Sequence, residues 1–252
     1  VTKEHLQNGT AKAVIVNSVN ANTCNADGIE KAEKMCSLVA EELGIDENDV
    51  IVASTGVIGQ ILPIEPIENG MKSLCEGLTY DGNSRAVEAI MTTDTMPKEV
   101  AVQFEIDGTV CTLGGMLKGS GMIHPNMATT LTFMTSDVNI SSELLQRALS
   151  DVVKITLNRV SVDGDTSTND MACIMASGAC GNKIIDGEDE RFEIFRNALY
   201  AVMMNLARLM ARDGEGATKL IECACVGASS EKTAETVAKS VITSSLFKAA
   251  MF

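Results

Sequence analysis

Hydrophobic residues follow two different spacings in the first part of the chain, and together they predict a strand, a helix and a second strand. Ala13–Asn17 and Val50–Ala53 are short β-branched runs, typical of strands that are buried on both faces. Between them, apolar residues recur at helical spacing over residues 29–43, and Gly44 follows as a C-cap. The second strand leads into residues 54–59, a loop of small residues that either presents backbone N–H groups to a ligand or is a simple turn.

The later part of the chain adds an antiparallel hairpin and three helical patterns. Val100–Ile106 and Thr109–Met116 alternate apolar and polar residues, and Asp107-Gly108 between them is a hairpin signal. The remaining patterns predict a strand over Ala128–Met134, a helix starting at Ser142, a long helix over Phe192–Arg212, a strand over Leu220–Val226 and a helix from Glu231. Parallel-type units combined with an antiparallel hairpin indicate an α+β fold with mixed sheets.

Composition narrows the classes of protein. The chain has 252 residues, of which 45% are hydrophobic and 21% charged, an ordinary globular balance. The net charge of −14 disfavours nucleic acid and anionic membranes, and a 3% aromatic content disfavours base-stacking platforms. We see neither a run of about 18 apolar residues nor a basic leader, so no membrane span or signal peptide is expected.

The eight cysteines do not form a metal-binding pattern in the sequence. They contain no CxxC pair, and the chain has only two histidines, His5 and His124. Most lie in apolar runs, where a free thiol behaves as a small hydrophobic side chain. We therefore expect reduced cysteines, no metal site and a cytoplasmic location.

Residues 118–135 hold the most informative chemistry, because a glycine-punctuated loop runs into a threonine-rich apolar strand. A threonine hydroxyl that lies against the preceding carbonyl can attack it, shift the acyl group from nitrogen to oxygen and, after hydrolysis, become an N-terminal nucleophile. Thr129, directly after Ala128, is the candidate, and its free α-amine would serve as the base without any histidine. Thr55 and Gly56 offer one hydroxyl and one backbone N–H for a developing oxyanion.

Two charged residues and one acidic loop complete the candidates. Lys118 and Glu215 could hold the charged ends of a small acyl acceptor, or they could be an exposed loop lysine and a surface acid. Asp163–Asp170 is not an EF-hand, because Thr168 and Ile174 occupy the positions that require Gly and Glu. The alternative for this loop is a network of Asx and threonine turns that shapes the site.

Several segments of the chain resemble the bifunctional ornithine acetyltransferase (glutamate N-acetyltransferase) family of arginine biosynthesis. They are Val14–Ala21, Ala53–Gly59, Ile90–Thr95, Lys118–Thr129, Val162–Asp170 and Arg212–Lys219. The resemblance implies self-cleavage between Ala128 and Thr129 into chains 1–128 and 129–252. It further implies transfer of acetyl from N2-acetyl-L-ornithine to L-glutamate through an acetyl ester on Thr129.

The same resemblance implies roles for individual residues. Thr55 and Gly56 would form the oxyanion hole. Substrate contacts would come from Thr92, Lys118, Thr129 and Glu215. Of the neighbouring threonines Thr92 and Thr93, we favour Thr92.

The resemblance also implies an assembly and a setting. Sheets would be layered between helices, with Thr129 at a strand start, and the two chains would remain associated, commonly as a heterotetramer. No cofactor is expected, although some family members also accept acetyl from acetyl-CoA. Family members begin several dozen residues before Val1 and continue well past Phe252, so a protein consisting of this chain alone would have an incomplete pocket and exposed apolar surface.

Two other functions keep the same residues. In an N-terminal-nucleophile aminopeptidase or amidohydrolase, water rather than glutamate would take the acyl group from Thr129. In an inert domain of the same fold, the Ala128–Thr129 bond would remain intact.

Overall fold

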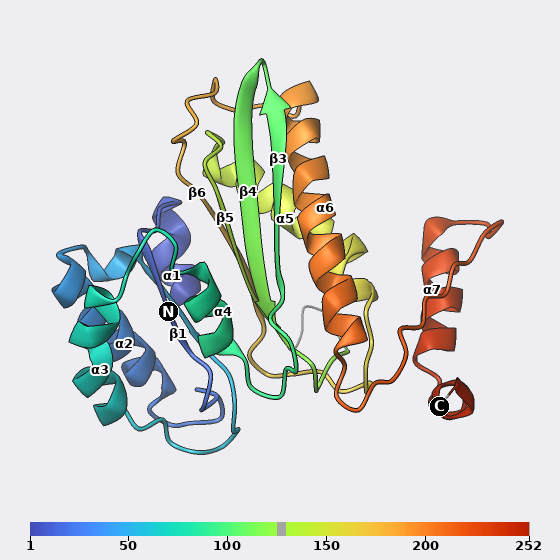
Figure 1. The fold of residues 1–252 in the computed structure, drawn as a ribbon, viewed down its shortest axis with the longest axis horizontal. Helices are drawn as coiled ribbons and strands as arrows, with labels where there is room; N and C mark the ends of the chain where they lie inside the picture. The colour runs from blue at the N-terminus through green and yellow to red at the C-terminus, as the bar shows by residue number, and fades with distance from the viewer. Residues whose placement is uncertain (125–129, 252) are drawn as a thin grey trace. The chain divides into compact units, whose positions relative to one another are not determined.

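The computed structural model describes residues 1–124 and 130–251, and its contacts divide the chain into two compact units. The first unit comprises residues 1–92 with 141–143, and the second comprises residues 93–140 with 144 onward. Figure 1 traces the elements of each unit in chain order. Each unit is described by itself below.

The first unit is a small parallel sheet with helices. Its helices and strands are α1 (Thr2–His5), β1 (Ala13–Asn17), α2 (Gly28–Leu43), β2 (Val50–Ser54), α3 (Glu65–Glu76) and α4 (Asn83–Ile90), with short 3₁₀ turns at Leu6–Asn8 and Glu47–Asp49. Strands β1 and β2 pair in parallel, with Ala13 opposite Val50. Helix α2 buries Met35 and Val39 in a core shared with both strands. Gly44 ends α2 in the left-handed conformation at φ 65°, so the predicted strand, helix, strand unit is confirmed.

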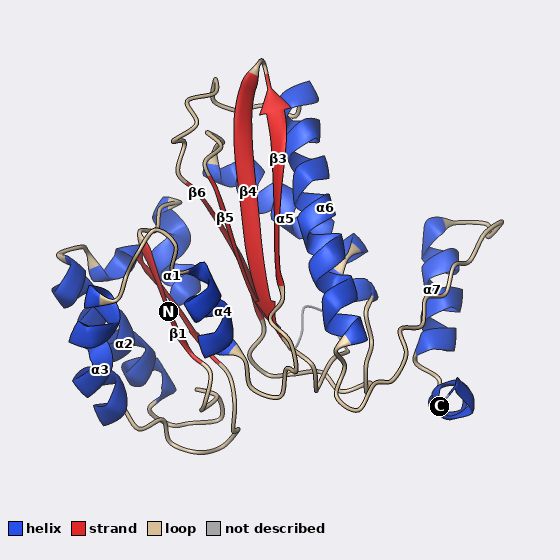
Figure 2. Cartoon of the chain, in the orientation of Figure 1, coloured by secondary structure: helices blue, strands red, loops and turns tan. Residues whose placement is uncertain are grey.

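The second unit is built on a mixed four-stranded sheet in the order β3-β4-β5-β6 (Figure 2). Its strands are β3 (Glu99–Ile106), β4 (Thr109–Lys118), β5 (Leu131–Ser136) and β6 (Met171–Ala176). The β3–β4 hairpin turns at Asp107 and Gly108, both with positive φ, as the Asp-Gly signal predicts. Strand β5 pairs antiparallel with β4 and parallel with β6, so the predicted α+β class with mixed sheets is confirmed.

Helices α5 (Ser142–Ile155) and α6 (Glu190–Arg212) contribute their apolar faces to one core with the sheet (Figure 1). Gly115 in β4 permits the close approach of α6. A Cβ atom there would lie 2.8 Å from Met134 Cγ and 3.1 Å from Val202 Cγ1. The strand and helix can pack this closely only because position 115 has no side chain.

The predicted strand over Leu220–Val226 is wrong, because the structure places this segment in no helix or strand. Its alternating apolar residues suit a strand, but among the described residues no strand pairs with it. An extended segment without a ladder partner is not a strand, whatever its propensity. Helices α7 (Glu231–Ile242) and α8 (Ser245–Met251) follow it, and α7 confirms the predicted helix.

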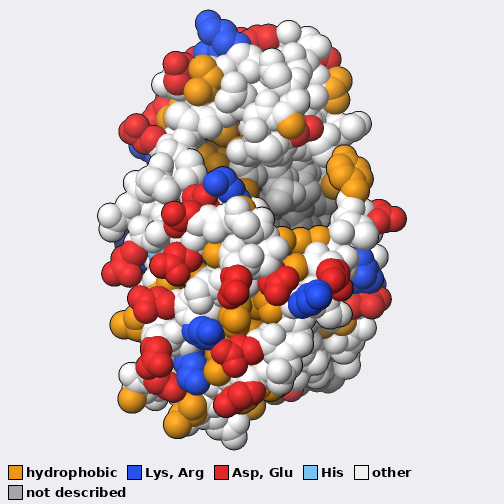
Figure 3. All heavy atoms as spheres, turned by 90° about the vertical axis from the view of Figure 1, so that its left-hand side faces the viewer, with side chains coloured by type: hydrophobic (Ala, Val, Ile, Leu, Met, Phe, Trp, Pro, Cys, Tyr) orange, Lys and Arg blue, Asp and Glu red, His pale blue; other side chains and the backbone are white. Residues whose placement is uncertain are grey.

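Surface and redox features agree with the composition. On the face in Figure 3, Lys and Arg side chains are scattered among Asp and Glu side chains and do not form a basic patch. All eight cysteines, each within the described residues, are free thiols. Among the helices that the structure describes, none has the length and hydropathy needed to cross a bilayer.

Candidate active site

The loop before the predicted cleavage bond is held by acidic side chains of the second unit. Asp94 Oδ1 accepts the Gly119 N–H at 2.8 Å, just beyond the end of β4. Further along, the Asp163 carboxylate accepts two consecutive backbone N–H groups, from Met122 at 2.6 Å and Ile123 at 2.9 Å. Because these bonds anchor the main chain itself, the path of the loop is set by two carboxylates.

The chain that follows the predicted cleavage bond is held by residues close to Asp163, namely Asp170 and Met171. Thr130 is buried, its carbonyl accepts the Met171 N–H at 2.8 Å, and its own N–H donates to the Asp170 carboxylate. Met171 lies opposite Leu131 at the start of the parallel β5–β6 pair. Residues 122–124 and 130–131 therefore both bind one segment, residues 161–171, which we call the brace.

The hydrogen bonds within the brace show how the acidic loop of residues 163–170 is built. Asp163 Oδ1 accepts the Asp165 N–H at 3.0 Å, and Thr166 donates its hydroxyl to the His124 carbonyl at 3.0 Å. An antiparallel bridge joins Ile123 to Thr166. These are Asx and threonine turns of the predicted kind, and they hold the neighbouring loop.

Lys118 is buried at the end of β4, so the alternative of an exposed loop lysine is wrong. Burial lowers the pKa of its ammonium group, while the carboxylates of Asp94 and Asp170 act in the opposite direction and Lys98 adds to the lowering. Lys118 lies opposite Leu131 in the β4–β5 ladder, and thus beside the strand that follows the predicted nucleophile. A desolvated cation in this position is suited to pair with an anionic substrate group.

Glu215 lies against the same loop although it is far away in sequence. Its N–H donates to the Ser120 carbonyl at 2.8 Å. A Cβ atom on Gly121 would come within 2.2 Å of Glu215 Oε2, so the carboxylate lies directly over that glycine. The Glu215 side chain is exposed, and the structure brings it together with the Lys118–Gly121 loop as the sequence predicts.

A buried charge cluster beneath this loop was not predicted. Lys98 is fully buried, with its Nζ 2.6 Å from Asp94 Oδ1 and 2.5 Å from Asp213 Oδ2. Thr95 donates its hydroxyl and its N–H to Asp213. The cluster joins the start of β3, the loop after β4 and the end of α6. The spacing of Asp94 and Lys98, four residues apart, was the only sequence signal, and such a pair is usually a solvated one.

The predicted oxyanion loop lies in the first unit, at the end of β2. The Thr55 N–H donates to the Asn17 carbonyl at 2.8 Å, and the Val57 N–H donates to the Val19 carbonyl at 3.1 Å. The N–H of Gly56, between them, therefore points away from β1, and β2 has no other strand neighbour among the described residues. Gly56 has φ 126°, and a Cβ there would lie 2.1 Å from the Val19 carbonyl oxygen, so the position requires glycine.

The remaining predicted residues are only partly placed. Ala128 and Thr129 lie outside the described residues. Thr92 is exposed and is the last residue of the first unit, whereas the Thr93 hydroxyl in the second unit lies 2.6 Å from the Ser120 hydroxyl. The structure therefore brings Thr93 to the Lys118 loop, and the preference for Thr92 stays a prediction.

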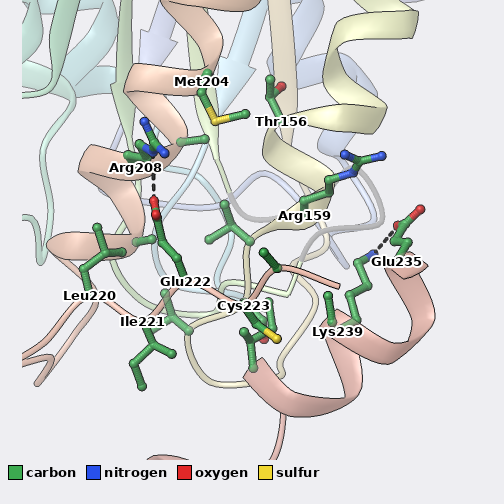
Figure 4. A pocket seen from close by; sticks show the side chains of 18 of the residues that line it. Thr156, Arg159, Met204, Arg208, Leu220, Ile221, Glu222, Cys223, Glu235 and Lys239 are labelled. Atoms are coloured by element: carbon green, nitrogen blue, oxygen red, sulfur yellow. Dashed lines mark hydrogen bonds and ion pairs between the residues drawn. The ribbon is translucent and has the colours of Figure 1, made fainter. Parts of the chain in front are cut away.

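A groove of about 570 Å³ lies elsewhere in the second unit (Figure 4). It is lined by α6, α7 and residues 217–225, including the segment predicted as a strand, and Arg208 pairs with Glu222 at 2.9 Å on its wall. Glu215 lines this groove, whereas Lys118 does not. Ser161 and Val162 of the brace line it too, so the groove borders the brace and Glu215 but does not reach Lys118.

Asp170 leads to a prediction about pH. Burial raises the pKa of its carboxyl to about 7, while the Thr130 N–H and Lys118 act to lower it. Because this value lies above the ordinary 3.8, the folded chain keeps a proton that the unfolded chain releases. The contribution of Asp170 to stability is complete below pH 4 and is lost as pH rises through 7.

In a Thr129→Ala chain, the free energy of unfolding should fall between pH 5 and pH 8, and Asp170 should account for about 2 kcal/mol of this fall. Adding Asp170→Asn to that chain should abolish this part of the fall. Urea denaturation at both pH values measures it. Asp165→Asn, at an exposed position of the same brace, is the matched control and should leave the pH dependence unchanged. Equal pH dependence in the Asp170→Asn and parent chains would contradict the assignment.

These observations define the class of protein to which the chain belongs. The chain is an α+β protein whose second unit presents a loop and a strand start, both tied to one acidic brace, beside a buried lysine. The ArgJ family model matches residues 1–252, so the chain belongs to the ArgJ family.

Individual relatives agree with the family match. The chain is 48% identical over 250 residues to "Arginine biosynthesis bifunctional protein ArgJ 1" of Clostridium acetobutylicum, covering 99% of this chain and 61% of that protein. It is 47% identical to the ArgJ protein of Caldanaerobacter subterraneus, with 99% and 62% covered. The chain thus spans about three fifths of the length of these relatives.

Two solved structures are similar to part of the chain. One is the Bacillus halodurans arginine biosynthesis bifunctional protein, with 43% identity, a TM-score of 0.46, and coverage of 50% of this chain and 66% of that one. The other is Mycobacterium tuberculosis ornithine acetyltransferase complexed with ornithine, with 32% identity, a TM-score of 0.44, and coverage of 50% and 67%.

Proposed function

We propose that the protein carrying this chain is a self-cleaving acetyltransferase of arginine biosynthesis, which moves acetyl from N2-acetyl-L-ornithine to L-glutamate. The observation that carries the proposal is the brace, which binds the main chain on both sides of the Ala128–Thr129 bond. Family membership over the whole chain supports the same activity. The reaction belongs to the acyltransferases and needs no metal or other cofactor.

Maturation begins with the threonine hydroxyl. The Thr129 hydroxyl attacks the Ala128 carbonyl, the amide C–N bond breaks and an ester forms, with the proton passing to the freed amine. Water then hydrolyses the ester and releases the Ala128 carboxylate together with Thr129 as a new N-terminus. Strand β5 is a rigid mount for this residue, since its first residues pair with both β4 and β6.

The transfer reaction uses the same hydroxyl. It attacks the acetyl carbonyl of N2-acetyl-L-ornithine, the α-amine of Thr129 takes the hydroxyl proton, and the ornithine amine leaves with that proton. The acetyl ester on Thr129 is then attacked by the glutamate amine, which regenerates the hydroxyl. Thr55 and Gly56 serve as oxyanion donors, a role that the direction of the Gly56 N–H, away from β1, supports.

Charge complementarity assigns the substrate contacts. Both amino acids carry an α-carboxylate, and the buried ammonium of Lys118 is the partner proposed for it. Glu215, whose carboxylate lies over Gly121, meets the cationic end of ornithine. Thr92 completes the contacts. Two copies of each chain stay together as a heterotetramer in the cytoplasm, and acetyl-CoA is a second donor to be tested.

Product analysis tests the proposal against its alternatives. The purified protein is incubated with N2-acetyl-L-ornithine, with and without L-glutamate, and the products are measured. Acetyl transfer predicts N-acetylglutamate only when glutamate is present. Acetate released at the same rate without glutamate would indicate a hydrolase, and a single intact chain that forms neither product would indicate an inert domain.

Asp163 provides a test of the brace. Asp163→Ala removes the acceptor for the Met122 and Ile123 N–H groups, which frees the loop that precedes the cleavage bond. Because a displacement of about 1 Å can cost about 100-fold in rate, we expect self-cleavage to slow by about 10–100-fold. The rate is measured as loss of the intact chain on denaturing gels.

Asp165→Ala is the matched control for Asp163→Ala, because its side chain is exposed on the same brace. It should cleave at the parent rate. A parent rate in Asp163→Ala, with the fold confirmed by circular dichroism, would show that the brace does not position the loop.

A further inference from the structure

Two thiols and one carboxylate meet in the second unit although they are far apart in the sequence. Cys111 lies in β4, Asp137 directly follows β5, and Cys180 follows β6. One ligand atom from each lies within 4.8 Å of the other two, and the two Sγ atoms are 3.3 Å apart. No CxxC or histidine spacing in the sequence indicates such a cluster, because its members come from three separate segments of the chain.

The backbone holds these three residues in place. The Asp137 carbonyl accepts the Cys180 N–H at 2.9 Å, and Asp137 Oδ1 accepts the Thr112 N–H at 2.7 Å, beside Cys111. The Asp137 N–H in turn donates to the Thr112 carbonyl at 3.3 Å. The ligand atoms therefore converge before any ligand binds, which keeps the entropic cost of binding small.

The donor set points to one class of ligand. Two sulfurs with one carboxylate oxygen suit a thiophilic divalent cation such as Zn²⁺, which binds sulfur at about 2.3 Å in tetrahedral geometry. Two such sulfurs lie about 3.8 Å apart, so a small opening of the observed pair would accommodate the ion. Cys111 is buried, whereas Asp137 and Cys180 are half-buried, so the cluster is reached from their side.

We propose that Cys111, Asp137 and Cys180 form a binding site for a thiophilic divalent cation, with water as the fourth ligand. Binding breaks two S–H bonds, forms two metal–sulfur bonds and one metal–oxygen bond, and releases two protons to the buffer. The ion clips the start of β4 to the segment after β6. Lys118 is seven residues further along β4, roughly 23 Å away at the rise of a strand, so the site is structural and separate from the proposed transferase chemistry.

Cobalt is the probe, because Co²⁺ bound to thiolates gives sulfur-to-metal charge-transfer bands. The reduced, chelator-treated protein is titrated with Co²⁺ and then with Zn²⁺ as competitor. We expect one Co²⁺ per chain with these bands, about two protons released per ion, and displacement by Zn²⁺. Zn²⁺ should also raise the thermal midpoint of the parent protein.

Variants assign the ligands. Cys111→Ser and Cys180→Ser should each weaken binding by more than about 100-fold, beyond the loss typical of residues that only support a ligand. Asp137→Asn should weaken it less. Cys173→Ser is the matched control, since Cys173 is another free thiol in this sheet, on β6, and it should bind as the parent does.

Three outcomes would overturn the proposal. The reduced parent protein could take up neither Co²⁺ nor Zn²⁺. The double variant of Cys111 and Cys180 could retain the charge-transfer bands. Peptide mapping of protein purified without oxygen could show Cys111 and Cys180 already joined in a disulfide, which would leave no thiol pair for a cation. Because Cys180 is half-buried, Cys180→Ser is the variant least expected to disturb folding, and a cooperative thermal transition checks that it folds.

Discussion

Lys98→Met is expected to lower the free energy of unfolding by about 3–5 kcal/mol, the cost of breaking a buried ion pair by removing one partner. The Lys98 ammonium lies 2.6 Å from Oδ1 of Asp94 and 2.5 Å from Oδ2 of Asp213, and all three side chains are almost fully buried. Methionine would fill the volume but would leave two carboxylates without their cation. Urea denaturation followed by circular dichroism measures the loss.

Lys154→Met is the control for this experiment. Lys154 is exposed and lies 3.4 Å from Asp151 on the surface of α5, where an ion pair contributes less than about 1 kcal/mol. A second comparison separates charge from packing. Replacing Asp94 and Asp213 by asparagine together with Lys98→Met should recover part of the loss, because no unpaired charge remains. A loss of less than about 1 kcal/mol in Lys98→Met would show that the cluster does not hold the loop and helix together.

Thr129→Ala is expected to abolish both self-cleavage and acetyl exchange, a loss of more than about 10⁴-fold, in the range observed when a catalytic nucleophile is removed. The proposed chemistry uses one hydroxyl twice, first on the Ala128 carbonyl and then on the substrate. Thr129→Ser keeps a hydroxyl and should cleave and transfer at a reduced rate. Denaturing gels measure cleavage, and isotope exchange between acetylornithine and labelled ornithine measures transfer.

Thr130→Ala is the matched control for Thr129, because it removes the adjacent threonine hydroxyl. Thr130 is buried, and its hydroxyl lies 3.4 Å from that of Thr132. Some loss of stability is expected, but cleavage should persist, since the Thr130 N–H and carbonyl that bind the brace remain. Cleavage that survives in Thr129→Ala and fails in Thr130→Ala would move the nucleophile by one residue.

The local patterns were sufficient for elements whose own residues determine them. Helix α2 has an apolar stripe and a glycine C-cap, and the β3–β4 hairpin has alternating residues around Asp-Gly. In both cases the period of hydrophobicity and the turn chemistry agree. The hydrophobic spacing also predicted the start of α5 at Ser142 and both ends of α6 to within two residues.

The failures share a physical cause, which is dependence on partners distant in sequence. Residues 220–226 have the composition of a strand, but a strand exists only when another one pairs with it. Lys118 was open to interpretation as an exposed loop lysine, and its burial follows from its place in the β4–β5 ladder. A spacing in the sequence does not reveal such packing.

The candidate site shows the same division. Motif resemblance named Lys118 and Glu215, and the structure brings both to the loop of residues 118–121. Asp163 and Asp170 are recognisable as turn formers in the sequence, but their hold on residues 122–123 and 130 requires the fold. The pair Cys111 and Cys180, 69 residues apart, is invisible without the sheet.

The most direct test of the central claim is peptide mass spectrometry of the protein after incubation with N2-acetyl-L-ornithine. We predict a new chain that begins at Thr129 and carries one acetyl group as an ester on that residue, which is lost when L-glutamate is added. An intact Ala128–Thr129 bond in protein that still forms N-acetylglutamate, or an acetyl group on any other residue, would contradict the account.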